Sequence, residues 1–125
     1  MMIKFTAEIV PVPLARSRIN FNTKRIYYPK RSREFKELLS VIGKSAMRGR
    51  EPLTGKLIAV IDLYKNCKVD SRSYGGVDNH QKAIFDALNK ICYVDDCQIV
   101  DVHCRKHKDK NPRIDIQIEE DFSND

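Results

Sequence analysis

The chain has 125 residues, a hydrophobic fraction of 42% and a charged fraction of 32%. These values suit one ordinary domain and exclude a disordered acidic chain, a collagen-like fibre and a disulfide-rich miniprotein. The formal net charge is +6, but residues 1–55 carry a net +8 and residues 56–125 a net −2. We therefore predict a single small domain over residues 1–125, with a basic half that attracts a polyanion.

The predicted elements begin with a strand over residues 3–10, where apolar and polar side chains alternate. A basic stretch with interleaved aromatic residues follows over 14–31, and Asn22-Thr23 marks the turn of a short hairpin. Apolar residues then recur at helical spacing over 33–48, with Ser32 as the expected N-cap.

The second half of the chain contains three strand patterns and one helix pattern. Residues 56–65 are rich in Ile, Val and Leu and predict a central strand, and Val77 to Lys90 predict an amphipathic helix. Residues 98–106 and 113–120 alternate as strands on either side of a turn, so we expect them to form a hairpin. The resulting prediction is an α+β fold, in which two helices pack on a small mixed sheet.

The sequence carries no sign of a membrane or secretory role. No stretch reaches the ~18–20 apolar residues of a membrane span, and the first ten residues lack the long apolar run of a signal peptide. The four cysteines include no C-x-x-C pair, which favours reduced, packed thiols over a structural zinc site. We expect a cytoplasmic protein.

The clearest chemical pattern lies on the second helix and in the turn after it. Asp78 and Lys82 are four residues apart and so share one helix face, where a plain surface ion pair is one interpretation. The adjacent acids Asp95 and Asp96 follow in a turn, which is either simply solvated or shares a cation. Carboxylates, a lysine and a basic surface together suit metal-dependent phosphodiester hydrolysis. Asp86 lies about 80° round the helix from Asp78, which favours a structural role.

Two segments carry a resemblance to a known family. V-D-N-H-Q-K-A-I-F-D-A-L-N, followed by I-C-Y-V-D-D-C-Q-I-V, resembles the signature of RusA-type Holliday junction resolvases. That signature has D-x-D-N, a lysine four residues after its second aspartate, F-D-A-L, and then D-D before a glutamine and two apolar residues. The opening P-V-P with its arginines and the segment Y-Y-P-K-R-S-R-E-F also resemble the family, so the likeness spans nearly the whole chain.

The resemblance implies a RusA-like fold and a homodimeric endonuclease, of a kind often carried by phages and prophages. Such an enzyme acts in DNA recombination and repair, binds four-way DNA junctions and nicks symmetric strands with Mg²⁺, for which Mn²⁺ can substitute. It uses no other small-molecule cofactor. By position, Asp78 and Asp96 match metal-binding catalytic aspartates and Lys82 matches the catalytic lysine, while Asp95 matches a supporting acid beside the metal ligand.

One position departs from the family pattern. The first aspartate of D-x-D-N falls on Gly76, and fewer anionic ligands would hold Mg²⁺ more weakly. Asp70, on the flexible preceding loop, is the first candidate to replace it, and Asp62 on the central strand is the second. The alternative is a catalytically weakened or inactive protein that still binds junctions.

The basic stretch has three interpretations: a solubilising loop, a face for an acidic protein partner of a metal-independent adaptor, or contacts to DNA phosphates. The basic residues of this stretch lie beside Phe21, Tyr27 and Tyr28, whose rings could stack on unpaired bases. For this reason, and because of the resemblance, we favour the DNA interpretation. The predicted DNA-binding residues are Arg16, Arg18, Lys24, Arg25, Lys30, Arg31 and Arg33.

Overall fold

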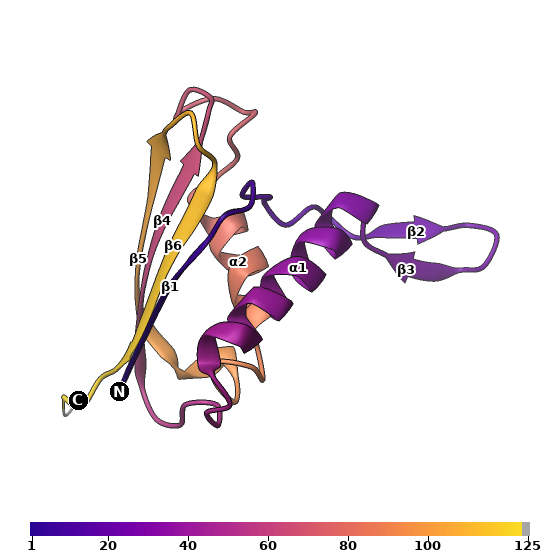
Figure 1. Cartoon of the computed structure of the whole chain (residues 1–125). Coiled ribbons are helices and arrows are strands. Elements are labelled where there is room, and N and C mark those ends of the chain that lie inside the picture. The colour runs from indigo at the N-terminus through magenta and orange to yellow at the C-terminus, as the bar shows by residue number, and fades with distance from the viewer. Residues whose placement is uncertain (124–125) are drawn as a thin grey trace.

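A four-stranded mixed sheet and two helices form the two layers of the protein (Figure 1). The computed structural model describes residues 1–123. The sheet has the order β1-β6-β4-β5, and its strands are β1 (Met2–Ala7), β4 (Leu57–Lys65), β5 (Ile99–Lys108) and β6 (Arg113–Glu120). The remaining elements are β2 (Arg18–Asn20), β3 (Arg25–Tyr27), α1 (Lys30–Met47), α2 (Val77–Leu88) and the short 3₁₀ helix η1 (Asp96–Gln98). The predicted α+β fold is confirmed.

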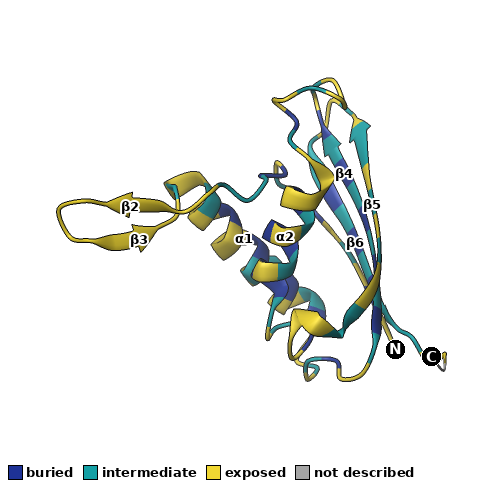
Figure 2. Ribbon diagram, turned by 180° about the vertical axis from the view of Figure 1, so that it is seen from behind, coloured by how far each residue is buried: buried dark blue, intermediate teal, exposed yellow. Residues whose placement is uncertain are grey.

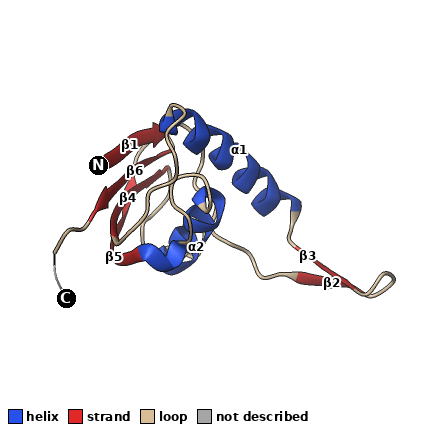
Figure 3. Ribbon diagram, turned by 90° about the horizontal axis from the view of Figure 1, so that it is seen from below, coloured by secondary structure: helices blue, strands red, loops and turns tan. Residues whose placement is uncertain are grey.

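Both helices cover the same face of the sheet (Figure 3). In β4, Leu57, Ile61 and Leu63 are fully buried on the helix side, whereas Asp62 and Tyr64 alternate with them and are half-buried on the other face. This period of two follows from the pleat of the strand. The other face of the sheet has no helix over it among residues 1–123. The core therefore lies between the sheet and the two helices.

The two helices pack closely against each other. The α1 residues Phe35, Leu39, Gly43 and Met47 recur at four-residue spacing and are all buried. Gly43 is required at the contact, because a Cβ there would lie 2.5 Å from Cδ2 of Leu88 on α2. Within residues 1–123, no helix is long and apolar enough to cross a membrane.

The first helix begins earlier than predicted. It starts at Lys30, with Pro29 at the N-cap and no side-chain cap hydrogen bond, so the expected capping role of Ser32 is wrong. Proline cannot donate a backbone hydrogen bond and its φ is already fixed near the helical value, which makes it a suitable residue at a helix start. The helix ends at Met47, and its C-cap residue Arg48 adopts the left-handed conformation with a φ of 52°.

The predicted hairpin between the last two strands is also wrong. β4 lies between β5 and β6, pairing parallel with β5 and antiparallel with β6. A parallel pair needs a crossover connection, and α2 supplies it between β4 and β5. The alternation predicted for β5 shifts as well: Val100 is the extra residue of a bulge, so Asp101 lies opposite Ile58 on the uncovered face.

The basic stretch forms an arm that projects from the domain. We use "the arm" for residues 18–27, in which β2 and β3 pair as a separate two-stranded hairpin (Figures 1 and 2). The hairpin predicted around Asn22-Thr23 is therefore confirmed, and every residue of the arm is exposed. An isolated two-stranded hairpin is marginally stable in water, and no further strand pairs with this one among residues 1–123.

Candidate active site

The start of α2 carries the first predicted site residue. Asp78 is exposed in the first turn of the helix, where the helix dipole favours a carboxylate. Its side chain folds back over Gly76: a Cβ built on Gly76 would lie 2.7 Å from Oδ1 of Asp78. Gly76 has a φ of −76°, which any residue can adopt. The position that departs from the predicted pattern is therefore in direct contact with the Asp78 carboxylate.

Three basic side chains hold the loop that leads into α2. The buried Lys65 donates from Nζ to the carbonyl oxygen of Tyr74 at 3.1 Å, and Nε2 of the buried His80 lies 2.6 Å from the same oxygen. Nζ of Lys106 donates to the carbonyl oxygen of Gly75 at 3.1 Å. These contacts fix the backbone immediately before Gly76, so they set the position from which Asp78 projects.

His80 is neutral in this environment. Burial lowers its pKa to about 4, and the charges of Lys65 and Lys106 act in the same direction, although the hydrogen bond to Tyr74 opposes them. The neutral ring donates from Nε2 to the Tyr74 carbonyl, and its Nδ1 is buried with no partner among residues 1–123. A proton on Nδ1 would place a buried positive charge beside two lysines, which is why the neutral form is favoured.

The exposed face of α2 continues from Asp78 through Lys82 to Asp86. All three side chains are exposed, and each follows the previous one after about one helical turn. No ion pair joins Asp78 to Lys82 in the part of the chain that the structure describes. The Lys82 amine is therefore accessible to a ligand from solvent.

The acidic turn after α2 gives its two aspartates different roles. Asp95 caps η1 in a reciprocal arrangement. Its backbone amide donates to Oε1 of Gln98 at 2.8 Å, and the backbone amide of Gln98 donates back to the Asp95 side chain. Hydrogen bonds from the Cys97 thiol and from the amides of Asp96 and Cys97 lower the pKa of Asp95. The carboxylate of Asp95 therefore accepts hydrogen bonds within the turn and stabilises its conformation.

Asp96 is the acid of this turn that has no capping role. Burial and then the neighbouring charge of Asp95 raise its pKa, and Asp86 on α2 contributes in the same direction. Adjacent carboxylates that repel one another are stabilised by a cation placed between them. The donors are hard oxygen atoms, which is the ligand type preferred by Mg²⁺ and Mn²⁺.

Gln98 and Tyr93 fix the acidic turn to the rest of the fold. The Gln98 amide donates to the carbonyl oxygens of Leu53 at 2.9 Å and Gly55 at 3.0 Å. The hydroxyl of the buried Tyr93 donates to the Phe85 carbonyl at 2.6 Å. The turn is therefore held both to the loop before β4 and to α2, which carries Asp78 and Lys82.

The acidic side chains of the candidate site are not arranged as a complete metal-binding site. Among residues 1–123, no three His, Cys, Asp or Glu side chains lie together in a way that could hold a metal ion. Asp70 is exposed and lies 3.8 Å from Nζ of Lys68. Asp62 is on the uncovered face of the sheet, where Arg105 at 3.0 Å and His107 at 2.7 Å bind its carboxylate. Asp62 is therefore separated by the sheet from the helices, and the second candidate for the missing ligand is not brought to Asp78.

The predicted DNA-binding residues are all exposed or partly exposed and follow one path. They run through the arm, the segment before it and the first turn of α1, in the order Arg16, Arg18, Lys24, Arg25, Lys30, Arg31 and Arg33. Arg33 additionally donates from Nε to the Tyr28 carbonyl at 3.1 Å, which ties the end of the arm to α1. The path gives the molecule a projecting basic edge.

Two roles in this site were not assigned from the sequence. The D-x-x-Q spacing of Asp95 and Gln98 is that of a capping box, which would have identified the glutamine as the residue that shapes the turn. The role of His80 has no such signal, because burial of its side chain depends on the loop folding over it. No local pattern indicates that burial.

Comparisons with known proteins identify the family of the chain. The sequence model of the family described as "Endodeoxyribonuclease RusA" matches residues 8–119. A protein of Bacillus subtilis (strain 168), named "Uncharacterized protein YqaN", is 28% identical over 137 residues, which cover 94% of this chain and 96% of that protein. The family match includes the arm, both helices and the acidic turn.

Proposed function

Since the chain belongs to the RusA family of endodeoxyribonucleases, we propose that it resolves Holliday junctions by nicking two symmetric strands during DNA recombination and repair. The observation that supports this most directly is the shared exposed edge of Asp78 and Lys82 on α2, held by Tyr93 to the turn that carries Asp96. The carboxylates of Asp78 and Asp96 are hard-oxygen ligands for a metal ion, and the Lys82 amine on the same helix as Asp78 is accessible.

The metal in this proposal is Mg²⁺, with Mn²⁺ as a substitute. Nucleases of this family generally depend on a divalent metal. Asp78 and Asp96 would hold it, and Asp70 is the candidate third ligand because the loop that carries it leads directly into α2. When bound, such a metal polarises the scissile phosphate and lowers the pKa of a coordinated water.

Two side chains act beside the metal ligands. The Lys82 ammonium stabilises the negative charge that develops on the phosphate or on the leaving oxygen. Asp95 supports the site by capping η1, since this cap fixes the direction in which its neighbour Asp96 points. The seven basic residues from Arg16 to Arg33 contact the DNA backbone without reading its sequence.

Symmetric nicking requires two active sites related by a two-fold axis, and one domain of this size carries one. We therefore propose a homodimer. Sedimentation of the protein with and without a four-way junction tests this directly: a monomer in both conditions contradicts resolution by paired nicks.

A second function is favoured by one specific observation, namely Gly76 in contact with Asp78. With a glycine there, the protein would bind junctions but cleave them weakly or not at all. Incubation with a synthetic four-way junction and Mg²⁺ separates the two functions. Nicking that is abolished in Asp78→Asn and Lys82→Met, but retained in Asp101→Asn, supports the nuclease. Binding without nicking at any protein concentration supports the second function instead.

A further inference from the structure

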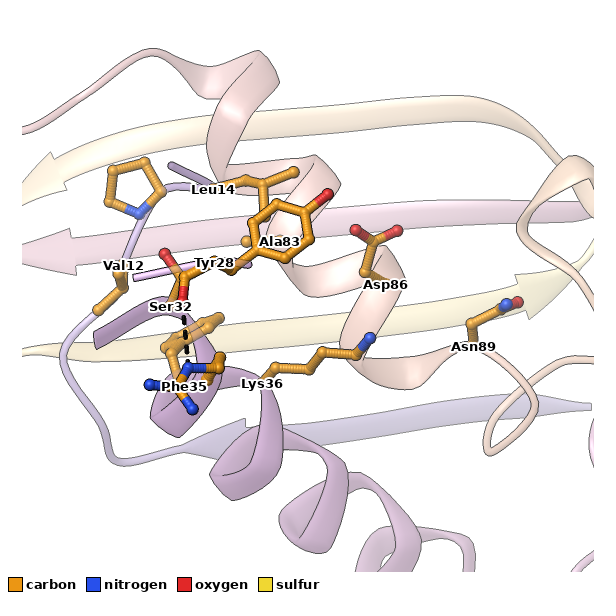
Figure 4. A pocket seen from close by; sticks show the side chains of 11 residues that line it. Val12, Leu14, Tyr28, Ser32, Phe35, Lys36, Ala83, Asp86 and Asn89 are labelled. Carbon is orange, nitrogen blue, oxygen red and sulfur yellow. Dashed lines mark hydrogen bonds between the residues drawn. The ribbon is translucent and has the colours of Figure 1, made fainter. Parts of the chain in front are cut away.

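A pocket beside the candidate active site is not used by the proposed chemistry. It opens between the first turns of α1 and the exposed side of α2 and has a volume of about 280 Å³ (Figure 4). Its apolar wall is made by Val12, Leu14, Phe35 and Ala83. Ala83 follows Lys82 directly in α2, so the pocket and the proposed catalytic lysine share one helical turn. This volume lies just below the ~300–1,000 Å³ of sites for drug-sized ligands, which suits a single ring system.

The polar groups of the pocket gather at one edge. Figure 4 shows the Asp86 carboxylate and the Lys36 amine beside the opening, with Asn89 beyond them. Oδ1 of Asn89 is buried and has no hydrogen-bond partner in the part of the chain that the structure describes. In Figure 4 the end of the Asn89 side chain points away from the Tyr28 ring, so the exposed Asp86 carboxylate is the acceptor that faces a ligand at the opening.

An aromatic ring and two cations complete the pocket. The Tyr28 side chain is 45% exposed, and its ring lies across the opening in Figure 4. The hydrogen bond from Arg33 to the Tyr28 carbonyl fixes this residue at the end of the arm. Arg33 and Lys36 both line the pocket and offer positive charge at its rim. A ring that fits here would stack on Tyr28, while a phosphate attached to it would meet the cations.

We propose that this pocket binds one unpaired nucleobase that carries an exocyclic amino group. The apolar wall and the Tyr28 ring suit the two faces of a base, and the oxygens of the exposed Asp86 carboxylate suit an amino group on its edge. The charge at the rim suits the phosphate of the same nucleotide. The inference rests on the proposed function, because branched DNA is what would supply an unpaired base next to Lys82.

Single nucleotides test the pocket without cleavage. We would titrate dCMP, dAMP, dGMP and dTMP into the protein in EDTA and follow the side-chain NMR signals of Tyr28, Ala83 and Asn89. The three amino-bearing nucleotides are expected to shift these signals and to bind at least about fivefold more tightly than dTMP, because thymine offers no amino group to the acceptors. Equal affinity for dTMP, or the absence of any shift at these residues, overturns the proposal.

Variants locate the site. In a single strand that carries 2-aminopurine, stacking quenches the fluorescence of the base, and we expect Tyr28→Leu to remove most of that quenching. Asp86→Asn is expected to reduce the preference over dTMP, whereas Asp101→Asn, on the uncovered face of the sheet, leaves it unchanged. Ala83→Phe fills the pocket and provides an independent variant, with thermal unfolding as the check on its fold. Quenching that persists in both Tyr28→Leu and Ala83→Phe contradicts the assignment.

The alternative occupant is a side chain from a second copy of the protein. If Tyr28→Leu or Ala83→Phe dissociates a dimer in sedimentation and leaves nucleotide binding unchanged, the pocket is a dimer contact and the proposal is wrong. The nucleotide titrations use neither a metal ion nor a junction substrate. A failure of base binding in them is therefore distinguishable from a failure of the proposed nuclease activity.

Discussion

The Oδ1 atom of Asp78 occupies the space next to Gly76, 2.7 Å from where a Cβ of residue 76 would lie. The contact is with the free end of a flexible side chain, so a larger residue at position 76 displaces the Asp78 carboxylate without disturbing the backbone. A carboxylate at position 76 would then lie beside that of Asp78.

Gly76→Asp is therefore expected to strengthen metal binding, because a further anionic ligand offsets the dehydration of Mg²⁺. We expect the Mg²⁺ concentration for half-maximal junction nicking to fall by about tenfold, which is the lower end of the effect that groups around a metal ligand have on metal affinity. Gly76→Ala is the matched control, since it displaces Asp78 equally but adds no charge. An equal response of both variants means that displacement alone, rather than a new ligand, is responsible.

His80 predicts a stability that depends on pH. Its folded pKa of about 4 lies below the ordinary value of 6.5, so between these values the unfolded chain binds more protons than the folded protein. Stability is full above pH 6.5 and falls as the pH drops towards 4, with a total loss of about 3 kcal/mol. Urea unfolding in EDTA from pH 7.5 to 4.5 measures this. The unfolding free energy of His80→Gln should change less with pH. If its slope against pH equals that of the unsubstituted protein, groups other than His80 cause the pH dependence.

Gln98 predicts a link between stability and activity. Gln98→Leu removes three side-chain hydrogen bonds, to Asp95, Leu53 and Gly55, and is expected to cost about 2–4 kcal/mol in unfolding free energy. Nicking should fall further than this loss of folded protein explains, because the turn that carries Asp96 is no longer attached to Leu53 and Gly55. Gln117→Leu, on the uncovered face of the sheet, serves as the control and should leave nicking unchanged.

The arm predicts how DNA affinity responds to salt. Arg18→Ala combined with Arg25→Ala is expected to reduce the slope of log affinity against log salt by about 0.9 for each DNA phosphate that the protein no longer neutralises. Circular dichroism should be unchanged, because both side chains are exposed and the arm forms a sheet separate from the four-stranded one. Lys110→Ala, in the turn between β5 and β6, should not change the slope. An unchanged slope in the arm variant would remove the arm from the DNA interface.

The elements that follow a local period were predictable, whereas the pairings were not. Alternation identified β1 and β6, the richness in Ile, Val and Leu identified β4, and the spacing of apolar residues such as Phe35 and Leu39 identified α1. The neighbour relation of β5 and β6 failed because a short turn favours a hairpin, while the strongly apolar β4 takes the central place between them. The bulge at Val100 also depends on a partner strand, and no local signal announces it.

The candidate site was predictable only to the level of residue type. The sequence predicts Asp78, Lys82 and Asp96 as site residues, and the structure puts the first two on one exposed edge of α2. The sequence did not indicate that Asp62 lies on the face of the sheet opposite the helices, because a strand residue can face either side until the register of the strand is known. The pocket bounded by residues 28 and 86 joins positions about sixty residues apart and had no sequence signature.

The crossover from β4 through α2 to β5 has a consequence for how the protein responds to its ligand. Asp78 and Asp96 both belong to this one connection, and β4 is the one strand that pairs with the edge strand β5 among residues 1–123. A cation shared by the two aspartates would act as a removable cross-link that shortens the loop before the edge strand. Loading the site should then slow amide hydrogen exchange in β5 more than in β1, the opposite edge. The edge strand would thereby report, from outside the site, whether the metal is bound.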